Sequence, residues 1–289
     1  MLSDAVLRRL DRLQLFYPAN ARGGAGGMRR SRALGSSVEF SDFREYVPGD
    51  DIRRVDWNAY ARFDRLYLKL FMEEQETTLF VLLDASASMA GGGKWEAARA
   101  IAEALCYLAL RAGDRVCFAC LRGAETLESP LFAGRAAYEK ASAFLDGVHP
   151  AGRMRLGERG AAVRVRGARG MAVVLSDLFS EDDWTRCPTR LLYAQRQTAL
   201  VHILAREELE PDVSGAVRLV DSETGEKIDL LAGGEAMRAY RRALAEFLAR
   251  SQDWCHKHAV RYAQVAADED LLAALLGPLT RAGMIRSRA

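Results

Sequence analysis

The chain has 289 residues, enough for one large α/β domain with additions or for two small domains. It is 49% hydrophobic and 28% charged with a formal net charge of +2, so it is globular in composition, and no global field favours nucleic acid or anionic membrane. No window approaches 18 consecutive apolar residues, and the first residues contain no secretory hydrophobic region. We therefore expect a cytoplasmic protein without a membrane span.

The N-terminal segment, residues 1–35, is expected to hold a helix and a linker. Leucines at helical spacing, with Ser3 as N-cap, predict an amphipathic helix over residues 3–17. Residues 21–32 are rich in glycine and arginine and follow no strand, which favours a flexible tether over a phosphate-binding loop.

Residues 36–77 form a second segment, dense in aromatic and charged residues. Pro48-Gly49 marks a turn, and Asp50 or Asp51 is placed to cap a short helix. Alternating leucines in RLYLKLFM then predict a strand. We expect this segment to be an extension packed on the main domain.

From residue 78 to 289 the chain alternates strand and helix patterns. Residues 78–84 are almost continuously apolar, as in a parallel strand covered on both faces. Residues 94–113 predict a long helix, and the alternation continues through strands over 114–121, 170–178, 198–204 and 260–265. A hairpin is expected to turn at Thr224-Gly225. The pattern predicts a doubly wound, mostly parallel sheet flanked by helices.

The five cysteines suit a reducing compartment. Cys117 and Cys120 form a C-x-x-C within a predicted strand, where their side chains should point to opposite faces. We expect core cysteines there instead of a metal site.

Oxygen-bearing side chains follow two of the predicted strands. Asp84 ends the strand at 78–84 and is followed by Ser86 and Ser88, and Asp177 follows the apolar run MAVVLS at 171–176. In open α/β sheets ligands bind beyond the carboxyl ends of the strands, and such oxygens suit Mg²⁺ or another divalent cation. The alternative interpretation is that these residues only form turns and helix caps.

Two motifs carry a resemblance to known families. Asp84-x-Ser86-x-Ser88 at the end of an apolar strand resembles the metal-ion-dependent adhesion site of von Willebrand factor type A domains. Residues 39–57, EFSDFREYVPGDDIRRVDW, closely resemble the hallmark of a bacterial family, domain of unknown function 58, which carries such a domain. Together the two regions cover roughly residues 30–275.

The resemblance implies a non-catalytic binding module that holds a divalent cation through Asp84, Ser86, Ser88 and Asp177. It also implies a protein partner, since members of the family are thought to act with MoxR-type AAA+ ATPases in maturing or assembling other complexes. The hallmark could supply a docking surface or a set of structural contacts. Its candidate partner-binding residues are Arg44, Tyr46, Asp50, Asp51, Arg53, Arg54 and Trp57.

One departure from the family concerns a threonine ligand expected around residues 150–160. No serine or threonine lies between Ser142 and Ser176; that loop offers Arg153, Arg155 and Glu158 instead. Because a guanidinium beside the two aspartates would repel a cation, we hypothesise that an arginine from this loop neutralises them in its place.

Two other classes of function remain open from the sequence. A metal-dependent hydrolase or phosphatase could act at Asp84, although a second aspartate two positions on is replaced by Ser86. The arginine-rich stretches 22–32 and 153–169 could bind nucleic acid or an anionic surface, but they lack interleaved aromatic residues.

Overall fold

A computed structural model describes residues 1–16, 39–48, 50–52, 55–72, 77–167, 170–194, 196–211, 215–220 and 225–288. The chain divides into two units, one made of Met1–Arg29 with Thr77–Ala289 and the other of Arg30–Glu76. Each unit is described by itself.

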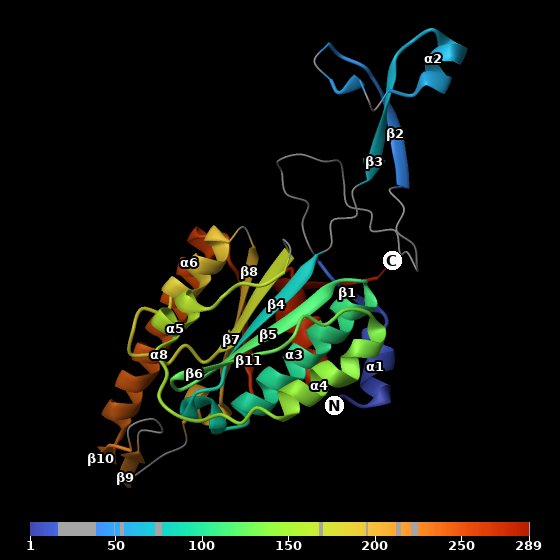
Figure 1. The fold of residues 1–289 in the computed structure, drawn as a ribbon. Coiled ribbons are helices and arrows are strands. Elements are labelled where there is room, and N and C mark those ends of the chain that lie inside the picture. Colours follow the sequence, from blue (N-terminus) through green and yellow to red (C-terminus); the bar gives the residue numbers. More distant parts are fainter. Residues whose placement is uncertain are drawn as a thin grey trace. The chain divides into compact units, whose positions relative to one another are not determined.

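The main unit is built on a six-stranded sheet in the order β11-β8-β7-β4-β5-β6 (Figure 1). Its strands are β4 (Thr78–Asp84), β5 (Arg115–Arg122), β6 (Glu125–Glu128), β7 (Gly170–Ser176), β8 (Gln197–Leu204) and β11 (Arg261–Ala266). All neighbouring pairs are parallel except β5 with β6, which is antiparallel. The structure thus confirms the predicted mostly parallel sheet.

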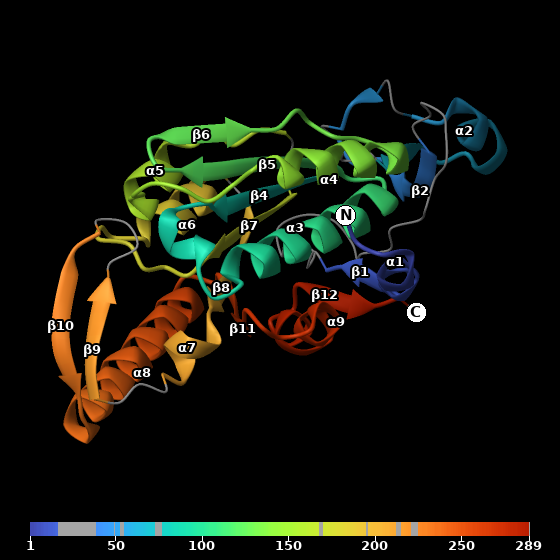
Figure 2. The same cartoon turned by 90° about the horizontal axis from the view of Figure 1, so that it is seen from below.

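Helices cover both faces of this sheet, as Figures 1 and 2 show. One face packs on α1 (Asp4–Leu10), α3 (Lys94–Arg111), α4 (Tyr138–Asp146) and α9 (Leu271–Ala274) with the π turn Leu275–Leu279. The other packs on α5 (Leu156–Ala162), α6 (Arg186–Tyr193) and α8 (Gly234–Lys257). Because β4 is buried along its whole length, its apolar run has no exposed face that would require alternating polar residues.

The two cysteines of the C-x-x-C lie in β5 on opposite sides of the sheet, as predicted. Cys117 belongs to the core cluster beneath α5 and α6, and Cys120 to the cluster beneath α3 and α4. All five cysteines are free and buried.

The predicted helix over residues 3–17 is wrong in its second half. Helix α1 ends at Leu10, and β1 (Leu13–Leu15) pairs antiparallel with β12 (Ile285–Ser287). Leu13 and Leu15 are both buried, which places alternate residues of an extended segment in the core. The long-range pairing with β12 therefore overrides the local helical pattern.

The hairpin β9 (Gly215–Val220) and β10 (Lys227–Ala232) is antiparallel as predicted. Of its expected turn residues, Thr224 lies outside the described residues.

The second unit contains β2 (Glu39–Glu45), α2 (Trp57–Phe63) and β3 (Tyr67–Met72). Strand β3 was predicted, and it pairs antiparallel with β2. The predicted helix cap is wrong: Asp56, not Asp50 or Asp51, accepts hydrogen bonds from the amides of Asn58 and Ala59.

Candidate functional site

Polar residues at the end of β4 and directly after it form a hydrogen-bonded cluster at the carboxyl edge of the sheet. Asp84 Oδ1 accepts hydrogen bonds from the amide and hydroxyl of Ser86, at 3.0 and 2.6 Å. The Ser86 and Ser88 hydroxyls lie 2.9 Å apart. Asp84 Oδ2 accepts a hydrogen bond of 2.6 Å from Ser176 at the end of β7, so the neighbouring strand ends meet as predicted.

Asp177, the next residue after β7, is fully buried beside a lysine. Lys94 Nζ lies 2.7 Å from Asp177 Oδ2 and 2.5 Å from Glu208 Oε1. Lys94 begins α3, and Glu208 lies in α7 (Arg206–Leu209), which follows β8. The amide of Phe179 donates to the other oxygen of Asp177, and the Phe179 ring lies 5.5 Å from the ammonium.

The charges of this cluster are strongly perturbed by burial. Burial, and then the negative charge of Asp177, raise the pKa of Asp84 to about 6, although its hydrogen bonds oppose the shift. Burial alone would lower the pKa of Lys94, but Asp177 and Glu208 together raise it above its ordinary value. Lys94 is therefore a charged ammonium held inside the protein.

The loop at 150–155 closes the cluster from a third side. The amide of Ala87 donates to the carbonyl of Gly152, and the amide of Ala151 donates to the carbonyl of Ala85. The carboxylate of Asp182, from the loop after β7, then accepts hydrogen bonds from the amides of Gly157 and Glu158. This cap holds the start of α5 against the loops after β4 and β7.

The arginines of this loop do not supply the cation that the structure places on Asp177. Arg153 forms an ion pair with Glu181, and Arg155 pairs with Glu158, all four side chains being about half exposed. Lys94, and not an arginine, supplies the cation beside Asp177. An internal lysine at the start of α3 reaches the buried carboxylate directly, whereas the arginines remain at the solvent-exposed rim.

His202 supports Asp177 from the next strand, β8. Its Nε2 lies 2.9 Å from the carbonyl oxygen of Asp177, and its Nδ1 lies 2.8 Å from the hydroxyl of Tyr262. A carbonyl only accepts hydrogen bonds, so Nε2 carries the proton and Nδ1 accepts from Tyr262. Burial lowers the pKa of His202 to about 4, which keeps the imidazole neutral.

His202 should make stability fall in mild acid. An unfolded histidine titrates near pH 6.5 and His202 near 4, so the unfolded state alone takes up this proton between those values. Between pH 7 and pH 5 we expect the wild type to lose about 2 kcal/mol more free energy of unfolding than His202→Gln. Urea unfolding at both pH values measures this difference, and the contribution of Asp84 is common to both proteins. The exposed His149→Gln serves as the control and should follow the wild type; equal pH dependence of His202→Gln and wild type would contradict the assignment.

Four residues of the cluster were missed by the sequence interpretation: Lys94, Ser176, His202 and Glu208. Ser176 could have been found, because it adjoins Asp177 at a predicted strand end. Lys94 and Glu208 carry no local signal, since a lysine at a helix start and a glutamate in a short helix are ordinarily exposed. His202 lies within the predicted strand at 198–204, and nothing in that pattern links it to Asp177.

The candidate residues of the second unit form a separate set. Arg44 pairs with Asp50 at 2.8 Å, and Asp50 also accepts a hydrogen bond from the amide of Val47. Trp57 is 58% exposed and packs edge-on against Tyr60. Tyr46 is half-buried and Asp51 exposed, while Arg53 and Arg54 lie outside the described residues. A hollow of about 680 Å³ is lined by residues of and beside α2, among them Asp56, Arg62 and Phe63.

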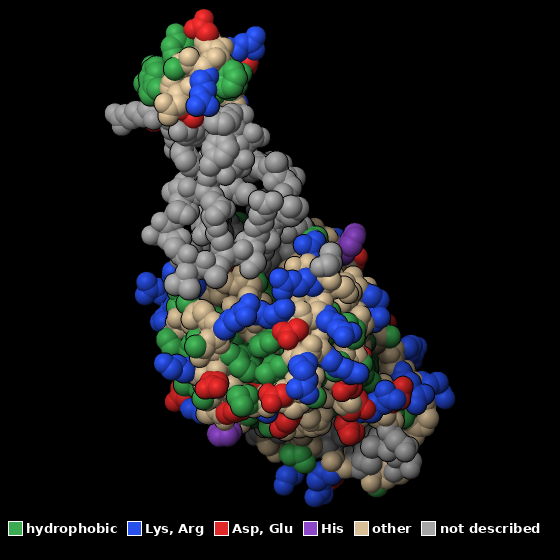
Figure 3. Space-filling model, turned by 90° about the vertical axis from the view of Figure 1, so that its right-hand side faces the viewer, with side chains coloured by type: hydrophobic (Ala, Val, Ile, Leu, Met, Phe, Trp, Pro, Cys, Tyr) green, Lys and Arg blue, Asp and Glu red, His purple; other side chains and the backbone are tan. Residues whose placement is uncertain are grey.

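The arginine-rich stretch at 153–169 is largely engaged in contacts within the protein. Arg159 donates to Ala124 and Thr126, and Arg166 pairs with Glu128. On the face of the main unit that Figure 3 presents, basic side chains are interspersed with acidic ones. The stretch at 22–32 lies outside the described residues. These contacts do not favour a continuous nucleic-acid surface over the described part of the second stretch.

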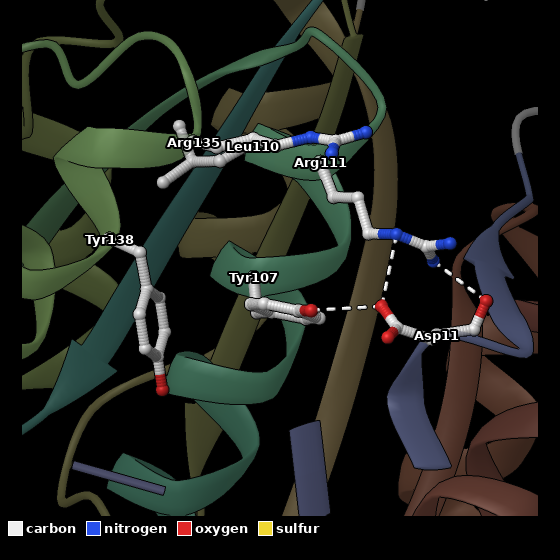
Figure 4. Close-up of a pocket in the computed structure, with 6 residues that line it drawn as sticks. All are labelled: Asp11, Tyr107, Leu110, Arg111, Arg135 and Tyr138. Atoms are coloured by element: carbon white, nitrogen blue, oxygen red, sulfur yellow. Dashed lines mark hydrogen bonds and ion pairs between the residues drawn. The ribbon is translucent and has the colours of Figure 1, made fainter. Parts of the chain in front are cut away.

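A smaller pocket of about 280 Å³ lies where α1 meets α3. Figure 4 shows Tyr107 and Arg111 pointing toward Asp11, which accepts a hydrogen bond of 2.8 Å from Tyr107 and pairs with Arg111 at 3.1 Å. Arg111 also donates to the carbonyl oxygen of Asp11. These contacts of Asp11 attach the end of α1 to α3.

Within the part of the chain that the structure describes, no helix is long and apolar enough to cross a membrane. The same residues contain no group of three or more His, Cys, Asp or Glu side chains that could hold a metal ion.

Comparisons with known proteins place the chain in a family. Uncharacterized proteins of Mycobacterium bovis and of Mycobacterium tuberculosis are 30% identical to it over 203 residues, covering 66% of this chain. The chain spans 62% of the length of those relatives. Among solved structures, the pilus adhesin SpaC from Lactobacillus rhamnosus GG is similar to this chain with a TM-score of 0.32 and 13% sequence identity. The matched region covers 68% of this chain and 24% of the adhesin chain. The model of a protein family of unknown function, DUF58, matches residues 42–252, and the chain belongs to that family.

Proposed function

We propose that this chain is a non-catalytic protein–protein interaction module of the von Willebrand factor type A kind, whose partner is a MoxR-type AAA+ ATPase. The observation that carries the proposal is the polar cluster of Asp84, Ser86, Ser88 and Ser176 at the carboxyl edge of a mostly parallel sheet. This is the edge at which α/β proteins bind their ligands. The family resemblance supplies the class of partner, and the role is assistance in assembling or maturing other complexes.

A binding role suits the state of the reactive groups better than catalysis does. Both oxygens of Asp84 already accept hydrogen bonds, and the side chain is buried, so it is not placed to attack a substrate. His202 uses both ring nitrogens in buried contacts. Burial raises the pKa of Cys117 to about 11 and that of Cys187 to about 12, which leaves both as unreactive thiols.

The rim above the cluster offers the surface for such a partner. Arg153, Arg155 and Glu181 line a hollow of about 420 Å³, and Phe179 is 40% exposed. The Phe179 amide donates a hydrogen bond to the Asp177 carboxylate, so this part of the rim lies directly beside the cluster. Arginine and aromatic side chains are enriched at the energetic centres of protein interfaces.

Changing the rim should weaken partner binding while leaving the fold intact. The full chain, used as bait, is expected to retain a MoxR-type ATPase from its native cells. We expect Arg153→Ala/Glu181→Ala to weaken binding of that purified ATPase about tenfold or more in an optical binding assay. A matched control, Asp253→Ala/Lys257→Ala, removes another exposed ion pair, near the end of α8.

Two outcomes would contradict the proposal. Failure of the full chain to retain any MoxR-type ATPase would remove the partner. Equal weakening by both double variants would show that the carboxyl-edge rim is not the binding surface.

A further inference from the structure

Lys94 is a buried cation that contacts Asp177, one of the four residues through which the family resemblance implies a metal ion. Its side chain is 3% exposed and lies against two carboxylates, those of Asp177 and Glu208. The Phe179 ring faces the ammonium at 5.5 Å, within the range of a cation–π interaction. An ammonium has three N–H donors, and these three groups surround it.

The carboxylate oxygens of Asp84 and Asp177 already accept hydrogen bonds. Asp84 accepts three hydrogen bonds, from the Ser86 amide and hydroxyl and from the Ser176 hydroxyl. Asp177 accepts one hydrogen bond on each carboxylate oxygen, from the Phe179 amide and from Lys94. A Mg²⁺ ion requires about six oxygen ligands in near-octahedral geometry.

The loop at 150–155 contributes no side-chain oxygen that could bind a cation. Its Met154 is buried, and Arg153 and Arg155 pair with Glu181 and Glu158 at the rim. A divalent cation next to Asp177 would also lie beside the Lys94 ammonium, and like charges at such a distance repel strongly in a buried site. The donor set around Asp84 and Asp177 therefore does not fit the metal of an adhesion site.

We propose that the Lys94 ammonium replaces the divalent cation of the adhesion site, so that the cluster is assembled without metal. The inference rests on the proposed function only in that the resemblance identifies the site. A lysine supplied by the chain itself holds the carboxyl edge in one arrangement at all ion concentrations. Glu208 extends this arrangement to α8, because its carbonyl accepts a hydrogen bond from Tyr240.

Mn²⁺ titration of the full chain, followed by the loss of free-ion spin-resonance signal, tests this replacement. Wild type is expected to show no saturable binding up to about 1 mM Mn²⁺, whereas Lys94→Ala leaves Asp177 and Glu208 without a counter-charge in a widened site. We expect Lys94→Ala to bind Mn²⁺ with a dissociation constant of about 0.1 mM or lower, which is at least tenfold below the limit of about 1 mM set for wild type. The gain should disappear in Lys94→Ala/Asp177→Asn. Lys140→Ala, at an exposed lysine of α4, should behave as wild type.

Micromolar Mn²⁺ binding by wild type that is lost in Asp84→Asn would overturn the proposal, and so would a folded Lys94→Ala that binds no better than wild type. If Lys94→Ala does not fold, Lys94→Gln takes its place, and the wild-type and Asp84→Asn titrations still decide the matter. The ion titration needs no partner protein, so failure to capture an ATPase would remove the proposed function and leave this result standing.

Discussion

Replacing Lys94 with methionine is expected to lower the free energy of unfolding by about 3–5 kcal/mol. Methionine keeps the apolar volume of the side chain but leaves the buried carboxylate of Asp177 without its cation. Removing one partner of a buried ion pair costs far more than removing an exposed pair, because the remaining charge stays desolvated. Urea unfolding monitored by circular dichroism measures the change.

A matched variant and a double-mutant cycle separate charge from volume. Lys140→Met removes an exposed lysine from α4 and should change stability by less than about 0.5 kcal/mol. Adding Asp177→Asn to Lys94→Met should recover about 2 kcal/mol, since asparagine keeps an acceptor for the Phe179 amide and removes the unpaired charge. Additive effects of the two substitutions would contradict a direct ion pair.

Gly92→Ala is expected to destabilise the protein by about 2–5 kcal/mol. Gly92 has a φ of 59°, where an L-residue is strained, and a Cβ built there would lie 2.3 Å from the Cβ of Ala205. Ala205 is the N-cap of α7, which carries Glu208, so relief of the clash would displace the helix that holds Lys94 from one side.

The neighbouring glycine supplies the control for this substitution. Gly91 has an extended backbone with a φ of −91°, and a Cβ there would meet nothing within 4 Å. Gly91→Ala should therefore lie within about 0.5 kcal/mol of the wild type in the same urea experiment. Equal losses at both positions would show that the close approach to Ala205 is not responsible.

The sheet and part of the site could be predicted because their signals are local and regular. The apolar run of β4 and the alternation of strand and helix predict a mostly parallel sheet. Parallel strands bring their carboxyl ends to one edge, so the meeting of the Asp84 loop with the end of β7 follows from strand order alone. The opposite faces of Cys117 and Cys120 follow from the two-residue period of β5.

Two predictions of helix boundaries failed, one because of a contact between distant segments and one because of a contact within the same segment. Leu13 continues the helical spacing of Leu7 and Leu10, yet it lies in a strand that pairs with residues 285–287. Asp50 and Asp51 precede an apolar pattern as a cap would, but Asp50 pairs with Arg44, and the helix begins at Trp57 with Asp56 as its N-cap. In the first case a long-range pairing outweighs a local preference of a few tenths of a kcal/mol per residue.

By itself, the sequence determined the α/β class, the strand ends that carry the site, and the absence of serine and threonine from the loop at 150–160. Only the tertiary structure decided which cation meets Asp177. Lys94 lies 83 residues from Asp177 and 114 from Glu208 along the chain. A lysine is buried only where the fold brings carboxylates around it. The sequence near residue 94 therefore does not predict its contacts with Asp177 and Glu208.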